Sequence, residues 1–256
     1  MLGSRCVSER EIVETAFGRP AVVMEHVRQR LDGELGIVLR DDHVVAVSAY
    51  RLGLRRVSDL PLPRLERLDV GGNGLHELRQ VPPSVRELYV YDNQLERLPA
   101  LPRLRVLDAN RNRLVELPEL HGVDFVYAAE NRLVAPPPMM GCRYANFSGN
   151  RLERLPHDPA IEELRLENAG LVTLPTSIRA LEGLRELSLR GNALTALPDE
   201  IGELSRLRVL DLRGNQLETL PESLARLRLT KLDLRWNPLS RRPAWLDEPR
   251  DTVVYT

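Results

Sequence analysis

The chain has 256 residues, of which 43% are hydrophobic and 29% are charged, so it is long enough for one large domain or two small ones. Its 36 lysines and arginines against 37 aspartates and glutamates give no overall basic field that would attract nucleic acid or an anionic membrane. The first residues lack the apolar core of a secretory signal, and no apolar run approaches the roughly 18 residues of a membrane span. We therefore expect a cytoplasmic protein, with export as a secreted effector left open.

Residues 1–43 are predicted to form a helical N-terminal cap. The segment EREIVETAFGRPAVVMEHVRQRL, residues 9–31, has the apolar spacing of one or two amphipathic helices. Ser8 and Glu11 are spaced like a capping box, and the stretch 18–20, which contains a glycine and a proline, predicts a break between the helices.

Residues 44–240 repeat one pattern. Aligned on an asparagine, segments such as VRELYVYDNQLERLP and LRELSLRGNALTALP share the form LxxLxLxxNxLxxLP. Ala169 takes the place of the asparagine in one unit and Leu52 takes it in a degenerate first unit, which makes ten units. The anchor asparagines are Asn73, Asn93, Asn112, Asn131, Asn150, Asn192, Asn215 and Asn237.

Each position of the repeat has a physical role. In LRELSLRGNALTALP, Leu187 and Leu189 alternate in a short strand and point inwards, while the residues beside them point outwards. The amide of Asn192 can bond backbone groups of its own turn and of the neighbouring turn, which would otherwise be buried unpaired. Because no coil buries its apolar residues alone, we expect parallel strands that stack into one continuous core.

These residues, from about 44 to 240, resemble a leucine-rich repeat protein of the bacterial type. The resemblance implies an α/β solenoid, a horseshoe with parallel strands on its concave face and extended or short helical links on its convex face. Units anchored from Asn73 to Asn150 are 19 or 20 residues long and resemble repeats of secreted bacterial effectors. Later units of 22 or 23 residues resemble cytosolic repeats of the Ras-suppressor kind, so the convex face should change near residue 175.

Residues 241–256 are predicted to form a C-terminal cap and tail. The sequence NPLSRRPAWLDEP allows a short helix that carries Trp245 onto the last coil, and DTVVYT follows as the tail. These atypical ends are what a stack of repeats needs to protect its core.

The residues predict no catalytic site, cofactor or metal ion. Secreted bacterial ubiquitin ligases join such repeats to a catalytic domain with a Cys-x-Asp motif. Neither Cys6 nor Cys142 begins such a motif, because neither has an aspartate two residues later. Cys142 takes an apolar position of its coil and is predicted to be a small buried thiol. Asp41, Asp42 and His43 indicate a polar turn, and no histidine pair has metal-ligand spacing. We therefore predict that the protein is not an enzyme.

The outward positions of the strands predict a binding surface. They lie six, four, two and one residues before each anchor and number 40, yet they hold seven of the 11 aromatic residues. Tyrosine offers contact area with little rotamer entropy, as at binding hot spots, and the alternative is that the rings only stack on each other. Five of the seven are expected to form one hydrophobic patch: Tyr89, Tyr91, Phe125, Tyr127 and Tyr144. The other two are Tyr50 and Trp236.

Arginines on the later strands complete the predicted site. Asp211 and Asp233 lie beside them, so mutual neutralisation is the alternative to an anionic ligand. We predict a monomeric scaffold that binds a protein or peptide, without nucleic acid or membrane. The alternatives are an effector-type repeat protein that restrains or targets a separate enzyme, and an oligosaccharide-binding module. The four arginines are Arg165, Arg190, Arg213 and Arg235.

Overall fold

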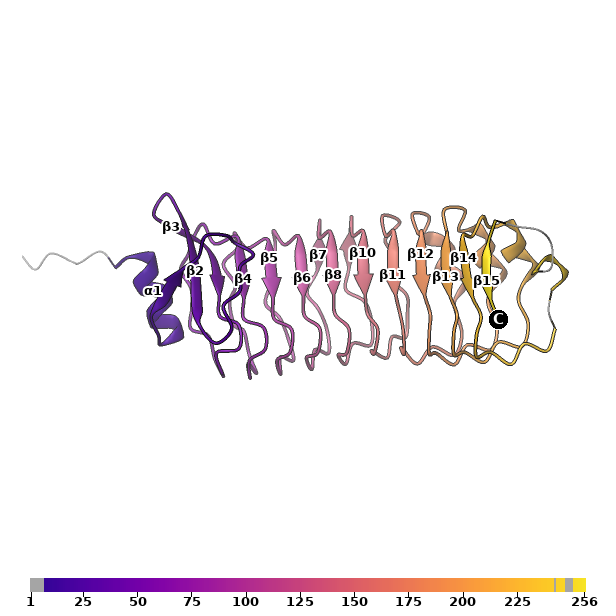
Figure 1. Ribbon diagram of the computed structural model, residues 1–256, viewed down its shortest axis with the longest axis horizontal. Coiled ribbons are helices and arrows are strands. Elements are labelled where there is room, and N and C mark those ends of the chain that lie inside the picture. The colour runs from indigo at the N-terminus through magenta and orange to yellow at the C-terminus, as the bar shows by residue number, and fades with distance from the viewer. Residues whose placement is uncertain (1–6, 242, 247–250) are drawn as a thin grey trace, which may run out of the picture.

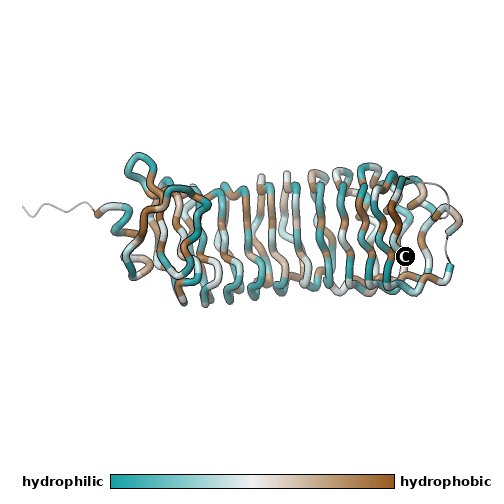
Figure 2. Tube along the Cα trace, viewed as in Figure 1, coloured by the Kyte–Doolittle hydropathy of each residue, from teal (hydrophilic) through white to brown (hydrophobic). Residues whose placement is uncertain are grey.

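The protein is an elongated solenoid. The computed structural model describes residues 7–241, 243–246 and 251–256, so Cys6 lies outside the described residues. Strands lie side by side along the long axis, from α1 at one end to β15 at the other (Figure 1). Along every coil, hydrophobic and hydrophilic stretches alternate (Figure 2), as expected for a chain that returns to the core once per turn.

Ten strands, one from each predicted repeat, form the body of a 13-stranded sheet and pair in parallel with one another. The inward leucines stay in register, so Leu88 lies beside Leu107. The predicted solenoid of parallel strands is confirmed. The ten strands are β3 (His43–Ser48), β4 (Arg67–Asp69), β5 (Glu87–Tyr89), β6 (Val106–Asp108), β8 (Phe125–Tyr127), β10 (Tyr144–Asn146), β11 (Glu163–Arg165), β12 (Glu186–Ser188), β13 (Val209–Asp211) and β14 (Lys231–Asp233).

The anchor asparagines join successive coils as predicted. The amide nitrogen of Asn93 donates to the carbonyl of Val90 in its own coil and to that of Val70 in the preceding coil, both at 3.0 Å. Its Oδ1 accepts from the backbone N–H of Leu75, also at 3.0 Å. The side chain therefore satisfies backbone groups that are buried inside the solenoid and cannot reach water.

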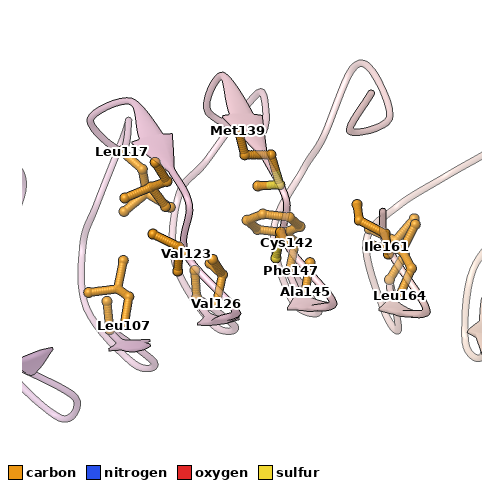
Figure 3. Packing of buried hydrophobic residues seen from close by; sticks show 14 of the residues in the cluster. Leu107, Leu117, Val123, Val126, Met139, Cys142, Ala145, Phe147, Ile161 and Leu164 are labelled. Atoms are coloured by element: carbon orange, nitrogen blue, oxygen red, sulfur yellow. The ribbon is translucent and has the colours of Figure 1, made fainter. Parts of the chain in front are cut away.

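One core runs through the coils. A single cluster of buried apolar side chains extends from Val13 to Leu246 and includes Leu187. Figure 3 shows Cys142 and Phe147 in this core, with Val126 and Leu164 in the adjacent coils. Cys142 is buried, as predicted, and takes the place of a leucine.

The convex side changes where the repeat lengthens. The short repeats use extended links, of which β7 (Leu120–His121) and β9 (Met139–Met140) pair as a separate two-stranded sheet. The longer links each contain a 3₁₀ helix that begins after a proline and buries an isoleucine or leucine. The predicted change near residue 175 is confirmed. The three helices are η1 (Thr176–Ala180), η2 (Asp199–Glu203) and η3 (Glu222–Arg226).

The N-terminal cap is helical only in its first half. Helix α1 (Glu9–Phe17) has the predicted capping box, and Gly18 ends it in the left-handed conformation. Of the one or two helices expected within residues 9–31, only α1 forms: β1 (Ala21–Val23) and the loop after it take the rest of that segment, and β2 (Leu35–Arg40) follows. The β-branched pair after Pro20 favours a strand, and β1 pairs in parallel with β2, where Ala21 lies beside Leu35. This pairing outweighs the local helical periodicity.

The hairpin turn between β2 and β3 explains the polar cluster before the repeats. Asp41 and Asp42 both have positive φ, 49° and 62°, as a two-residue turn between antiparallel strands requires. The predicted polar turn is therefore correct, but it joins two strands instead of a helical cap and a strand.

The C-terminal end contains a short helix and one more strand. Helix η4 (Ala244–Leu246) places Trp245 in the core, as predicted. The residues predicted as a tail instead form β15 (Val253–Tyr255), which pairs in parallel with β14. Two β-branched valines and a tyrosine are residue types that favour strands, which accounts for the added strand.

Candidate functional site

We call the solvent-facing side of the repeat strands the concave face. Its N-terminal end is covered by the loop between β1 and β2, residues 24–34, which we call the covering loop. Met24 of this loop packs with Val38, Val45 and Ala46 of the hairpin, and Leu31 packs against the same cluster. Because Ala46 lies in a concave position, the chain itself occupies the first part of the predicted binding surface.

Arg30 of the covering loop reaches onto the concave face and binds Asp69. The Arg30 Nε lies 2.7 Å from Asp69 Oδ2, and the carboxylate is almost completely buried. The guanidinium carbon lies 5.6 Å from the ring centre of Tyr50, 5.5 Å from that of Tyr89 and 5.3 Å from that of Tyr91. Three predicted binding tyrosines therefore surround an arginine of the same chain, an arrangement in which the rings and the carboxylate both stabilise its charge.

Gly71 makes room for this cluster. A Cβ atom at this position would lie 2.6 Å from the Tyr91 ring, closer than nonbonded carbon atoms approach. The neighbouring Tyr50 and Tyr91 rings have centres 6.1 Å apart and an angle of 41° between their planes. The missing side chain in the turn after β4 thus leaves room for the Tyr91 ring beside the arginine.

Tyr89 is held by one residue of the preceding strand and one of its own strand. The guanidinium of Arg67 lies 4.0 Å from its ring centre, and its hydroxyl donates to Glu87 Oε2 at 3.2 Å. Arg67 also pairs with Glu87. Burial raises the pKa of Tyr89, so the phenol stays protonated at neutral pH. Much of this ring serves contacts inside the chain.

A second group of rings lies two strands further on and is formed by Phe125, Tyr127 and Tyr144, which we call the central aromatic cluster. The Tyr127 and Tyr144 ring centres are 4.8 Å apart. Arg143 lies over Phe125 at 5.2 Å and Arg165 over Tyr144 at 5.8 Å. All three rings are half-buried, so each keeps an exposed part.

The prediction of one continuous hydrophobic patch is wrong. Strand β6 separates the two groups of rings, and Asp108 lies in register between Tyr89 and Tyr127. A carboxylate in this position requires water or a cation, because burial without one is costly. The aromatic part of the concave face is therefore two clusters with an acidic group between them, and we call β5 to β10 the aromatic section.

Strands β11 to β14, the charged section, contain three predicted arginines that are neutralised within the chain. Arg165 Nε lies 2.7 Å from Glu163 Oε1, and Arg213 Nε lies 2.9 Å from Asp211 Oδ1. Arg235 Nη2 lies 2.7 Å from Asp233 Oδ2. A shallow hollow of about 210 Å³ lies over β11 to β14, and its charged lining consists of the first two of these pairs together with Glu167, Glu186 and Lys231.

The two remaining predicted residues lie apart from these pairs. Arg190 is exposed and makes no ion pair in the described part of the chain. Trp236 is 68% exposed and has a φ of 61°, because it lies in the left-handed position of the turn directly before its anchor. Arg235 lies over its ring at 5.6 Å, at the far end of the solenoid from the aromatic section.

The geometry gives no support for a nucleophile or a metal site. Burial is the main cause that raises the pKa of Cys142 to about 12, which keeps the thiol protonated. Among the described residues, no group of three His, Cys, Asp or Glu side chains is placed to hold a metal ion. Within the same ranges, no helix has the length and apolar character needed to cross a membrane.

Comparison with known sequences identifies the repeats. The family model described as "Leucine rich repeat" matches residues 159–217 and 182–239. The chain is a leucine-rich repeat protein. No curated protein sequence matches it. Proteins with this repeat are in general non-enzymatic scaffolds for protein interactions.

Solved structures support a repeat protein of the bacterial type. A leucine-rich repeat protein from Leptospira interrogans is 30% identical with a TM-score of 0.67, over 78% of this chain and 57% of that one. YopM, a leucine-rich effector protein from Yersinia pestis, is 28% identical with a TM-score of 0.56, over 75% of this chain and 60% of that one. The leucine-rich repeat domain of APL1B, 22% identical with a TM-score of 0.55 over 69% and 63% of the two chains, shares the fold. The chain thus spans less than two thirds of the length of these structures.

Two residues that organise the aromatic section are not among the site residues predicted from the sequence. Arg30 was placed in a predicted helix, and no local pattern indicates that it reaches Asp69, 39 residues away. Asp108 lies in a predicted outward position, but it is neither aromatic nor an arginine and so is not among the predicted site residues. A signal was present: the sequences DLR at 211–213 and 233–235 supply an arginine two residues after the aspartate, whereas Asp108 is followed by Asn110 at that place.

Proposed function

We propose that the protein is a non-enzymatic scaffold that binds a protein or peptide partner on the aromatic section of its concave face. The observation that carries this proposal is the central aromatic cluster. Phe125, Tyr127 and Tyr144 lie on the solvent side of strands whose other side is already packed in the apolar core, with Val126 and Ala145 fully buried. Half-exposed rings in such positions have no role in packing that core, and rings of this kind are enriched at binding hot spots.

The dimensions of the surface support a macromolecular partner. Ten strands spaced by about 4.8 Å extend over about 43 Å, which matches an extended segment of roughly a dozen residues. The hollow over the charged section is open and shallow, unlike the enclosed pocket that a small metabolite needs. The partner is therefore expected to contact several strands at once.

The test is capture of partners by the full chain and two variants. The first variant, Tyr127→Ala with Tyr144→Ala, removes the stacked pair of the central aromatic cluster. The matched control, Val134→Ala with Val172→Ala, removes exposed apolar side chains outside the concave positions. Quantitative mass spectrometry should find a protein that the control captures as well as the wild type and that the first variant loses.

Equal capture by all three baits would contradict the proposal. In that case the rings only stack on each other. Binding of the wild type to glycans in an array, with no protein lost from the first variant, would instead favour the oligosaccharide alternative.

The similarity to YopM supports a second candidate. Because YopM is described as an effector protein, this chain is proposed alternatively to be an effector-type repeat protein whose partner is an enzyme that it restrains or targets. The two candidates differ in where the partner occurs. Capture from the lysate of a host cell but not from that of the producing cell would favour the effector.

A further inference from the structure

Four aspartates occupy one column of the concave face, four residues before their anchors. Three of them accept a hydrogen bond from an arginine. Arg30 Nε lies 2.7 Å from Asp69 Oδ2. Arg213 Nε lies 2.9 Å from Asp211 Oδ1, and Arg235 Nη2 lies 2.7 Å from Asp233 Oδ2. The fourth, Asp108, forms no ion pair with any described residue. The column consists of Asp69, Asp108, Asp211 and Asp233.

The surroundings of Asp108 explain why it lacks an arginine. In β13 and β14 the arginine comes two residues after the aspartate, but here Asn110 takes that place. Asp108 Oδ1 accepts only the backbone N–H of Asn110, at 3.3 Å, and the Asn110 side chain accepts the N–H of Ala129 at 2.7 Å. Burial raises the pKa of Asp108, although Asn110 and Arg30 act in the opposite direction. Within the described residues, this half-buried carboxylate thus has no cation in direct ion-pair contact.

Aromatic rings flank this carboxylate. Tyr89 and Tyr127 are its register neighbours on the two adjacent strands. The negative charge of Asp108 contributes, after burial, to raising the pKa of Tyr127, and it also contributes for Tyr91, where burial and Asp69 act more strongly. The backbone N–H of Val90, the residue before Tyr91, donates to the Asp108 carbonyl at 2.8 Å, so Tyr91 leaves β5 next to this carboxylate. On the other side, the Tyr127 ring centre lies 4.8 Å from that of Tyr144.

The same molecule shows what such a setting binds. Asp69 lies on β4, the neighbour of β5 on the side away from β6. There the carboxylate and tyrosine rings hold the guanidinium of Arg30, whose carbon lies 5.3 Å from the Tyr91 ring centre. A guanidinium suits both components, because its planar fork pairs with a carboxylate and its face stacks on aromatic rings. An ammonium group would pair with the carboxylate but stack less well.

We propose that Asp108 binds an arginine side chain of the partner, with Tyr91 and Tyr127 beside the guanidinium. This inference rests on the proposed function, in which a protein or peptide occupies the aromatic section, and it assigns the chemistry of one partner residue. The partner's arginine repeats at β6 the contact that Arg30 makes at β4. The partner segment is therefore expected to be basic at the position that crosses β6.

The test uses a small probe and the full chain. N-acetyl-arginine-amide is titrated into the protein while the side-chain NMR signals of Tyr91 and Tyr127 are followed. The neutral isostere N-acetyl-citrulline-amide serves as the probe control. The arginine probe should shift both tyrosines and the citrulline probe should not, because citrulline keeps the shape but lacks the charge.

Three variants separate Asp108 from the rest of the face. Asp108→Asn should weaken binding of the arginine probe about tenfold or more, as expected for loss of a charged hydrogen-bond acceptor. Asn110→Arg keeps the carboxylate but places an arginine where β13 and β14 have one, so it should block the probe from within the chain. Asp211→Asn, in the same column but already paired, should bind the probe as the wild type does.

Failure of this inference is distinguishable from failure of the proposed function. The arginine site is overturned if the wild type does not bind the probe, if citrulline binds equally well, or if Asp108→Asn and Asn110→Arg leave the affinity unchanged. The proposed function fails separately, if Tyr127→Ala with Tyr144→Ala captures the same proteins as the wild type.

Discussion

The aromatic section and the charged section share one core but satisfy their polar groups differently. In the charged section, each aspartate of the column has an arginine on its own strand, so the surface neutralises itself. In the aromatic section, rings stay half-exposed and Asp108 has no cationic partner in the described chain. A repeat fold thus keeps its inward positions constant while the outward positions of neighbouring coils follow different chemistry.

The largest effect is expected in the core, where the two sections should behave alike. Leu107→Ala in the aromatic section and Leu187→Ala in the charged section each remove a fully buried side chain. Each should lower the free energy of unfolding by roughly 2–5 kcal/mol, because a cavity remains. Chemical denaturation followed by circular dichroism measures this. An unchanged transition in either variant would refute the register of its strand.

The column of aspartates should give effects of opposite sign. Asp233→Asn removes the partner of Arg235 and a second contact with Arg213, so it should destabilise by about 1–3 kcal/mol. Asp108→Asn removes a half-buried charge without an ion pair and should leave stability unchanged or slightly higher at neutral pH. Melting temperatures of the two variants test this contrast. A loss for Asp108→Asn as large as that for Asp233→Asn would show that Asp108 already has a stabilising partner.

The pH dependence sharpens the same contrast. The hydrogen bond from Arg235 is the main cause that lowers the pKa of Asp233 from 3.8, so its stabilisation is complete above that pH and is lost as pH falls below it. Burial raises the pKa of Asp108, so its ionisation destabilises the fold above the raised pKa, and this cost declines as pH falls to 3.8.

Stability measured against pH checks the sign for each residue. The difference between the wild type and Asp233→Asn should shrink only below pH 3.8, whereas that between the wild type and Asp108→Asn should shrink at higher pH. Identical pH ranges for the two differences would contradict the distinction between a paired and an unpaired carboxylate.

The smallest effect on stability is expected from the central aromatic cluster. Replacing Tyr127 and Tyr144 by alanine removes one cross-strand ring contact, which contributes about 0.2–1 kcal/mol. The melting temperature should therefore change little while partner capture is lost. A large fall in melting temperature would show that the rings mainly stabilise the sheet.

The aromatic section was predictable in composition but not in arrangement. The outward positions of Tyr127 and Tyr144 follow from counting back from the anchors, because side chains alternate along a strand. That Tyr91 faces Arg30 does not follow, because the covering loop reaches it through long-range packing of residues such as Met24. Local periodicity carries no information about such a contact.

The solenoid follows from local sequence patterns. The spacing of leucines and asparagines sets the strand, the turn and the return to the core within each coil, and these are local relations repeated ten times. The lengthening of the links likewise determined where the 3₁₀ helices begin. How the strands at the two ends pair, and which charged residues form ion pairs, depends on tertiary contacts. The pairing of β1 with β2, the added strand β15 and the pairing of Arg30 with Asp69 depend on contacts between segments separated in the sequence. The same contacts give Asp108 no ion-pair partner among the described residues.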